Sequence, residues 1–70
     1  MNRYLVEIFW SNDDSGYIAT VPDLPGCSAY GDTLEEAARE IKDAQDAWLE
    51  ACLASGGSVP QPAAQARKAA

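Results

Sequence analysis

The residues that most often carry enzymatic chemistry are scarce in this chain of 70 residues. The chain has no histidine, which removes the serine–histidine and cysteine–histidine arrangements of nucleophilic catalysis. Its two cysteines are Cys27 and Cys52, and Cys27 has no evident activating base. A thiol in that position is more often a small buried hydrophobic group than a nucleophile. These residues therefore give no indication of histidine- or cysteine-based catalysis.

Carboxylates are the one abundant reactive group. Two-metal hydrolysis needs several of them to converge on ions that lie ~3.5–4 Å apart. The first expected strand offers only Glu7, while Asp13 and Asp14 fall in a turn, where aspartate is common anyway. We therefore predict that the chain is not an enzyme and has no cofactor or metal.

The charge of the chain is strongly negative, with a net value of −6. Through residue 57, eleven acidic residues face only Arg3, Arg39 and Lys42, which gives −8. Such a body repels phosphate, so we expect no direct binding of nucleic acid by this chain alone. It suits a basic protein partner, although net charge also serves solubility alone. The candidate partner-binding residues are the acids of the loops and the helix cap, namely Asp13, Asp14, Asp23, Asp32 and Glu35.

Three short strands are expected to position these acids. Residues 3–10 alternate in a two-residue period, and residues 11–16 form a dense turn signal. A second strand over residues 17–21 should pair back on the first and end at Pro22, which cannot donate to a ladder. A second turn then leads to a short third strand at residues 27–30.

A long helix follows the strands. Thr33 and Glu36 have the spacing of a capping box, and Asp32 with Glu35 offers the same spacing one residue earlier. We expect Gly31 to let the chain reverse before this cap, and residues 56–57 (Gly-Gly) to end the helix. Apolar residues recur at three- and four-residue intervals along one stripe. The members of that stripe are Leu34, Ala37, Ala38, Ile41, Ala44, Trp48, Ala51 and Cys52.

This order predicts an α+β fold, a three-stranded antiparallel sheet with one helix on one face. We place the domain at residues 1–57 and a Pro/Ala-rich tail at residues 58–70. One helix covers only one side of a sheet, so the first strand must meet something else. We therefore predict a homodimer or a higher even-numbered oligomer with Leu5, Phe9 and Trp10 at the interface.

Two further expectations concern the cysteines and the location of the chain. Cys52 should lie ~15 Å beyond the helical position that faces Cys27, and a disulfide needs Cα atoms within ~7 Å, so no disulfide is expected. The start of the chain lacks the apolar core of a secretory signal, and no apolar run approaches the ~20 residues that span a bilayer. We therefore expect a cytoplasmic protein without a membrane segment.

Several motifs resemble those of one known family. G-Y-I-A at residues 16–19 is followed by V-P-D-L-P-G-C at residues 21–27 and G-D-T-L-E-E-A at residues 31–37. This pattern resembles the HicB family of antitoxins, and V-P-Q-P at residues 59–62 is similar to the family's proline-rich exit from the helix. The resemblance extends over residues 3–62.

The resemblance implies a truncated RNase H-like β-β-β-α-β fold and a role as an antitoxin. Its partner would be a HicA-type mRNA endonuclease, a small basic protein that the antitoxin sequesters. Many family members also carry a C-terminal DNA-binding domain, and nothing after Pro62 is long enough for one. A short fourth strand is not readable in residues 63–70. The alternative to a toxin-binding role is an orphan HicB-like domain that only associates with itself. A residual metal-dependent ribonuclease, which the implied RNase H-like fold raises, is the less favoured alternative.

Overall fold

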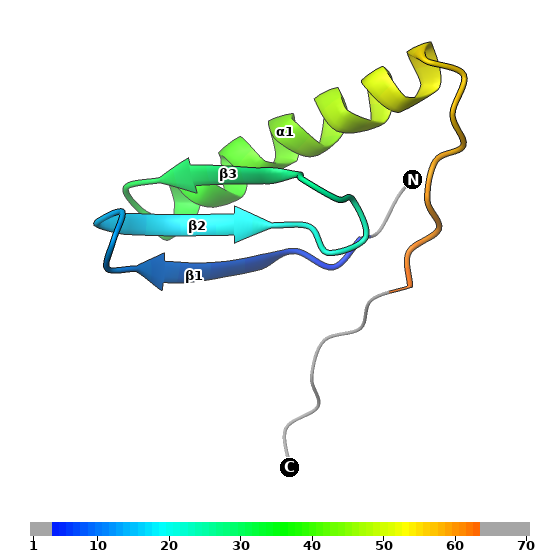
Figure 1. Ribbon diagram of the computed structural model, residues 1–70. Helices are drawn as coiled ribbons and strands as arrows, with labels where there is room; N and C mark the ends of the chain where they lie inside the picture. Colours follow the sequence, from blue (N-terminus) through cyan, green and yellow to red (C-terminus); the bar gives the residue numbers. More distant parts are fainter. Residues whose placement is uncertain (1–3, 64–70) are drawn as a thin grey trace.

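Three antiparallel strands, β1 (Glu7–Ser11), β2 (Gly16–Thr20) and β3 (Ser28–Gly31), precede one helix, α1 (Leu34–Ala54). They are seen in a computed structural model, which describes residues 4–63. The strands lie in the order β1-β2-β3, and α1 packs on one face of their sheet (Figure 1). The predicted α+β fold is therefore confirmed. No fourth strand occurs among residues 4–63. Residues 64–70, most of the segment considered for a fourth strand, lie outside the described residues.

The predicted start of the first strand, residue 3, is wrong: β1 begins at Glu7. The register explains the difference, because Glu7 pairs with Thr20, the last residue of β2. Continued pairing would bring residue 5 opposite Pro22, which has no N–H to donate. Val21 uses its own N–H for the Cys27 carbonyl at 3.2 Å. The β1–β2 ladder therefore stops where the proline loop begins.

The alternation of side chains gives the sheet two unlike faces. Ile8, Ala19 and Ala29 are partners across the three strands and pack into the core beneath α1. On the other side, Phe9 is opposite Ile18, and Ile18 is opposite Tyr30. We call this second side the outer face. Ala19 is fully buried, whereas Phe9 is 50% exposed and Tyr30 is 42% exposed, so no part of residues 4–63 covers the outer face.

Both ends of α1 are fixed by the residues that the sequence indicates. Thr33 Oγ1 accepts the N–H of Glu36 at 3.0 Å, and Glu36 Oε1 accepts the N–H of Asp32 at 3.0 Å. The second bond goes to the residue before the cap, one position from the usual capping box. At the other end Gly56 has a φ of +83°, and the two glycine N–H groups donate to Leu53 and Cys52 carbonyls in a Schellman arrangement.

Gly31 serves a different purpose from the chain reversal that we predict for it. Its φ is not in the left-handed region, which among the described glycines contains only Gly26 and Gly56. A Cβ on Gly31 would instead lie 2.3 Å from the backbone nitrogen of Ala37. Glycine is required here because the first turn of α1 passes directly against the end of β3.

The chain returns to the domain after α1. Val59 packs against the core, and the hydroxyl of Tyr4 donates a hydrogen bond to the Pro60 carbonyl. The N–H of Ala63 donates to the Asp23 carboxylate at 3.0 Å. Residues 58–63 therefore contact the domain, and the boundary after residue 57 stays a prediction. No helix among the described residues combines the length and the apolar character that crossing a membrane requires.

Candidate protein-binding surfaces

Four of the five predicted partner-binding acids lie at one end of the sheet. Asp13 and Asp14 are in the turn that follows β1. Asp32 lies in the short link between β3 and α1, and Glu35 lies in the first turn of α1. We call these four residues the acidic end. Asp23 lies in the loop at the opposite end, about one five-residue strand length, or ~16 Å, away. The structure therefore brings four of the acids together and leaves Asp23 apart.

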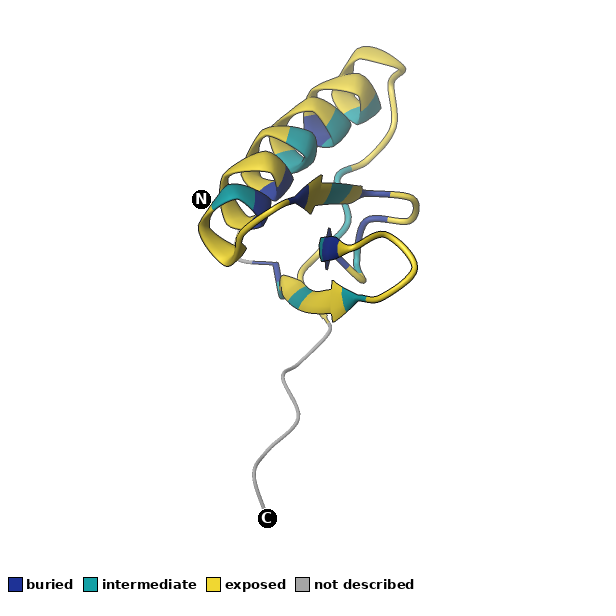
Figure 2. Cartoon of the chain, turned by 90° about the vertical axis from the view of Figure 1, so that its left-hand side faces the viewer, coloured by how far each residue is buried: buried dark blue, intermediate teal, exposed yellow. Residues whose placement is uncertain are grey.

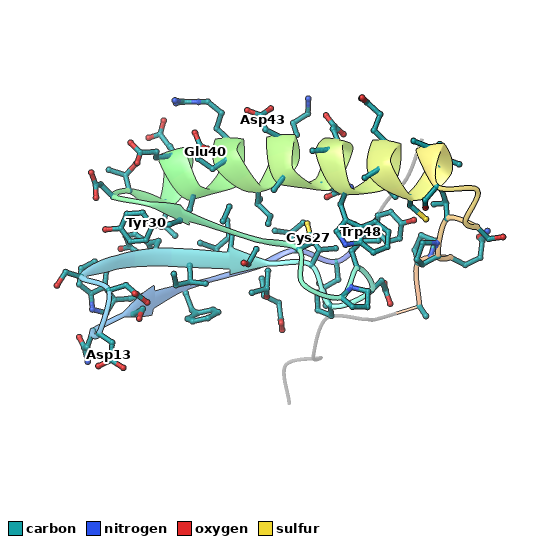
Figure 3. All side chains as sticks on the ribbon, turned by 45° about the horizontal axis from the view of Figure 1, so that its top comes forward. Asp13, Cys27, Tyr30, Glu40, Asp43 and Trp48 are labelled. Carbon is teal, nitrogen blue, oxygen red and sulfur yellow. The ribbon has the colours of Figure 1, made fainter. Side chains whose placement is uncertain are left out.

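Tyr30 joins the two segments of the acidic end. Its hydroxyl lies 3.1 Å from Asp32 Oδ1 and 3.3 Å from the carbonyl oxygens of both Asp14 and Ser15. The single hydroxyl proton serves one of these acceptors at a time, and all three are oxygen atoms that favour the neutral phenol. The bond to Asp32, followed by burial and the nearby carboxylates, raises the pKa of Tyr30 above its usual value. Figure 3 shows Tyr30 and Asp13 at the same end of the molecule.

The sequence gives little sign of this role for Tyr30. The signal is Gly16, because a Cβ there would lie 2.3 Å from the Tyr30 hydroxyl oxygen and 2.5 Å from its ring carbons. Gly16 and Tyr30 are 14 residues apart, on neighbouring strands of the outer face. The glycine can be read as room for a tyrosine only once the strand register is known.

The acids of this end differ in how tightly the fold holds them. Asp14 is fixed, since Ser11 Oγ donates to its carboxylate at 2.8 Å. Asp32 accepts from Tyr30 as described. The exposed carboxylates of Asp13 and Glu35 make no hydrogen bond or ion pair within residues 4–63. These two carboxylates are the ones most available to a partner.

The loop at the opposite end, residues 21–27, is held by buried side chains and by hydrogen bonds of its own backbone. Leu24 is only 1% exposed, and its N–H donates to the Val21 carbonyl at 3.0 Å. Cys27 then donates to the Leu24 carbonyl at 3.0 Å, across a turn with Pro25 and Gly26 in the middle. Gly26 has a φ of +81°, as a type II turn requires at that position. The motif at residues 21–27 therefore serves mainly to shape and bury this loop.

The helix holds this loop in place. Trp48 Nε1 donates to the Pro25 carbonyl at 3.0 Å while its indole packs against the core. Cys27 is buried beside it, and burial raises the pKa of its thiol. Cys27 and Cys52 are both free thiols in the structure.

The three residues predicted at an oligomer interface lie on or beside β1. Phe9 is on the outer face, while Trp10 points to the helix side. There its ring packs edge-on against the ring of Tyr17, with 5.2 Å between the two ring centroids. Trp10 is nevertheless 51% exposed, because α1 lies chiefly along β3 and approaches β1 least. Figure 2 shows the exposed residues of β1 away from the helix. Leu5, just before the strand, is half-buried.

The carboxylates that a nuclease would need are not gathered in one place. Glu7 begins β1, whereas Asp13 and Asp14 follow its far end. Within residues 4–63 no three His, Cys, Asp or Glu side chains are arranged to hold a metal ion. No pocket opens among these residues. The candidate binding surfaces within residues 4–63 are therefore the acidic end and the exposed sides of β1.

Comparison with known proteins shows the family. Residues 4–70 match the HicB-like antitoxins of bacterial toxin–antitoxin systems. A UPF0150 protein of Thermoplasma acidophilum is 35% identical over 63 residues, which cover 90% of each chain. A UPF0150 protein of Synechocystis sp. is 36% identical over 55 residues, 79% of this chain and 75% of the relative. This protein therefore belongs to the HicB-like antitoxin family.

A phage relative is longer than this chain. An uncharacterized 14.9 kDa protein of Haemophilus phage HP1 is 40% identical over 48 residues, which are 69% of this chain but only 36% of the phage protein. The match therefore spans about a third of that relative.

Proposed function

We propose that this protein is an antitoxin that sequesters a basic HicA-like mRNA endonuclease through its acidic end. The observation that carries the proposal is the meeting of Asp13, Asp14, Asp32 and Glu35 at one end of an antitoxin-family domain. An endonuclease that binds RNA presents cationic side chains to phosphate. Exposed carboxylates held on one rigid end suit the same side chains and compete with RNA for them.

The mechanism is occlusion, and it needs no bond to be made or broken by the antitoxin. Carboxylates at the acidic end attract the toxin over distances of about the Debye length, ~8 Å at physiological salt. Asp13 and Glu35, which are free of other bonds within the described chain, then pair with the toxin's cations. The Tyr30 hydroxyl lies within hydrogen-bond distance of both the turn and Asp32 and donates to either, which keeps the turn close to the helix cap, so that both segments meet the partner together. Binding should therefore weaken as salt rises.

The test compares two pairs of neutralised acids. Asp13→Asn with Glu35→Gln removes two charges from the acidic end, and Asp43→Asn with Glu50→Gln removes two from the exposed outer side of α1. Figure 3 shows Asp43 on the side of the helix that faces away from the sheet. If a HicA-like protein is encoded beside this gene, the first pair should weaken binding to it about 10- to 100-fold, chiefly by slowing association. The control pair should change binding by less than about threefold.

Two results would contradict the proposal. One is the absence of binding at micromolar concentration between the wild-type protein and a HicA-like neighbour. The other is an equal loss of affinity from both double variants, which would mean that net charge and not the acidic end attracts the toxin. Both measurements use calorimetry or surface binding at several salt concentrations. We place this encounter in the cytoplasm, where the toxin's mRNA substrate is found.

The exposed apolar side chains of β1 favour a second candidate function, that of an orphan domain that associates only with itself. Phe9 and Trp10 are half exposed, and Leu5 precedes them on the same segment. Self-association and toxin binding use different parts of the surface, so they are compatible. We include a homodimer or a higher even-numbered oligomer in the proposal, and light scattering of the isolated protein tests it. A protein that forms oligomers but binds no toxin would support the orphan function and contradict the antitoxin function.

A further inference from the structure

Trp10 is exposed to solvent and is nevertheless held in one orientation. It is 51% exposed, on the helix side of β1. Its indole N–H donates to the side-chain oxygen of Asn12 at 2.7 Å, and its ring packs edge-on against the ring of Tyr17. A side chain that two neighbours already orient loses little freedom when a partner binds. Trp10 is therefore suited to be an anchor residue in an interface with another protein.

The same two contacts determine which atoms of Trp10 a partner can use. The indole N–H is the only polar group of the side chain, and it is already bonded to Asn12. Tyr17 covers one part of the ring, and α1 approaches β1 less closely than the other strands. The part of Trp10 that stays open to solvent is therefore ring surface. Such a surface is apolar, and its face attracts positive charge through the ring quadrupole.

The pair of Trp10 and Tyr17 lies near the acidic end of the sheet. Trp10 is opposite Tyr17 and Tyr17 is opposite Gly31, so these three residues form one row across the strands. The first turn of α1 packs against Gly31, two strand spacings or ~9.5 Å from Trp10. Asp13 follows Trp10 by three residues, at most ~11 Å between Cα atoms. Figure 1 shows the turn after β1 and the link from β3 to α1 at one end of the sheet. The open ring surface therefore lies in the negative field of the acidic end.

We propose that the pair of Trp10 and Tyr17 binds an arginine side chain of the basic partner, with the guanidinium stacked on the open ring surface of Trp10. This assignment rests on the proposed function, because the partner is the toxin that the acidic end attracts. A guanidinium is planar and weakly hydrated, so it lies flat against an indole ring and keeps its N–H groups at the rim. Those N–H groups then pair with nearby carboxylates, such as that of Asp13, which makes no bond within residues 4–63.

Charge complementarity selects arginine over the other groups that stack on tryptophan. The chain has a net charge of −6, so a nucleic-acid base would bring its phosphate toward carboxylates. An uncharged apolar group would use the ring but gain nothing from the field of the acids. A lysine ammonium is a compact and strongly hydrated ion, so it gains less from a flat ring. Arginine is the side chain that uses both the ring and the carboxylates.

Two short peptides of equal charge test the choice of arginine. Hexaarginine and hexalysine carry the same number of cations, so the net charge of the protein attracts both alike. The wild type should bind hexaarginine with a dissociation constant at least about 3-fold lower than that for hexalysine. Trp10→Leu should raise the dissociation constant for hexaarginine about 3- to 10-fold, and that for hexalysine less than about 3-fold. Calorimetry at low salt measures all four values.

Phe9→Leu is the matched control, because Phe9 is the preceding residue of β1 and is 50% exposed on the outer face. It removes a ring of similar exposure from the other side of the strand and should change the binding of either peptide less than about twofold. Asp13→Asn with Glu35→Gln should weaken the binding of both peptides, which separates the charge of the acidic end from the arginine site. Equal losses from Trp10→Leu and Phe9→Leu, or an unchanged ratio of the two peptides in Trp10→Leu, would overturn the arginine site and leave the proposed function standing.

A second measurement uses the wild-type protein and so does not depend on the folding of a variant. The two tryptophans give two indole N–H signals in an NMR spectrum, and that of Trp48, bonded to the Pro25 carbonyl at the loop end, is an internal control. Hexaarginine should shift the Trp10 signal and leave the Trp48 signal in place. A Trp10 signal that stays in place at saturating hexaarginine would overturn the proposal. So would one that moves with a single-stranded hexanucleotide RNA and not with hexaarginine, because the ring would then be a platform for bases.

Discussion

The two ends of the sheet are built on different principles. At the loop end, residues 21–27, the chain is held by burial and by bonds between its own backbone groups, and Leu24 is almost completely enclosed. At the acidic end the hydrogen bonds involve exposed side chains, with Tyr30 between the turn and the helix cap. Buried bonds contribute more to stability than exposed ones, which water can replace. The difference separates an end that maintains the fold from an end that is free to bind.

The most damaging change should be Leu24→Ala at the loop end. It leaves a cavity beneath the proline turn and should lower the free energy of unfolding by about 2–5 kcal/mol. That is a large fraction of the stability of so small a domain. The control is Leu53→Ala, at a site that is 62% exposed, which should change stability by less than about 0.5 kcal/mol. Urea titration followed by circular dichroism measures both, and equal effects would mean that the loop is not part of the core.

The loop end is also the region that the sequence predicts best. Two prolines, Gly26 and Leu24 determine its turns locally, and the caps of α1 are just as local. The start of β1 is predicted badly, since it depends on where Pro22 ends the partner strand. That information is not in residues 3–10 themselves. Local chemistry therefore predicts turns and caps, while strand limits depend on pairing.

Beneath the acidic end, the contact between β3 and α1 should be the next most sensitive. Gly31→Ala places a Cβ against helix backbone, which cannot move aside as a side chain can, and should cost about 1–3 kcal/mol. Gly16→Ala instead meets the ring of Tyr30, which can rotate away. Its cost should be smaller, with a larger loss of partner binding than of stability. Urea titration and partner binding should be measured on both, and the opposite ranking would show that Tyr30 is held more rigidly than the helix.

The acidic end could be predicted only in part. Its acids follow from turn and cap chemistry, and the order of elements brings Asp13 and Asp32 to the same end. The separation of Asp23 follows from the same order, because one strand lies between. Tyr30 could not be predicted, since its contacts cross from β3 to the turn before β2. Side-chain contacts between strands need the register, which no single segment contains.

Removing the Tyr30 hydroxyl should have a moderate effect. Tyr30→Phe keeps the ring over Gly16 and loses the hydroxyl that donates to Asp32 or to the turn, so its urea midpoint should fall below that of the wild type. Tyr17→Phe is the matched control, because the Tyr17 hydroxyl makes no hydrogen bond within the described residues. If both variants have the wild-type urea midpoint, the two segments of the acidic end are not coupled through this hydroxyl.

The smallest expected effect is a loss of stability at alkaline pH. The folded structure raises the pKa of Tyr30, mainly through its bond to Asp32, above the value of about 10 for a free tyrosine. A group whose pKa is raised by folding stabilises the protein fully below its unfolded pKa, and that contribution disappears as pH rises through the folded pKa. The contribution of Tyr30 should therefore be intact at about pH 9 and fall above about pH 10.

Two other groups change in the same direction. Burial, followed by the charges of Asp23 and Cys52, raises the pKa of Tyr4, and burial raises that of Cys27. Tyr4 and Cys27 belong to the core and the loop end. The pH dependence of stability in the wild type therefore combines their contributions with that of Tyr30 at the acidic end. The Tyr30→Phe variant retains Tyr4 and Cys27 and lacks only the acidic-end group. Urea midpoints measured from about pH 8 to about pH 11 should therefore fall less steeply in this variant than in the wild type. Identical slopes would show that the alkaline loss comes from the core and the loop end alone.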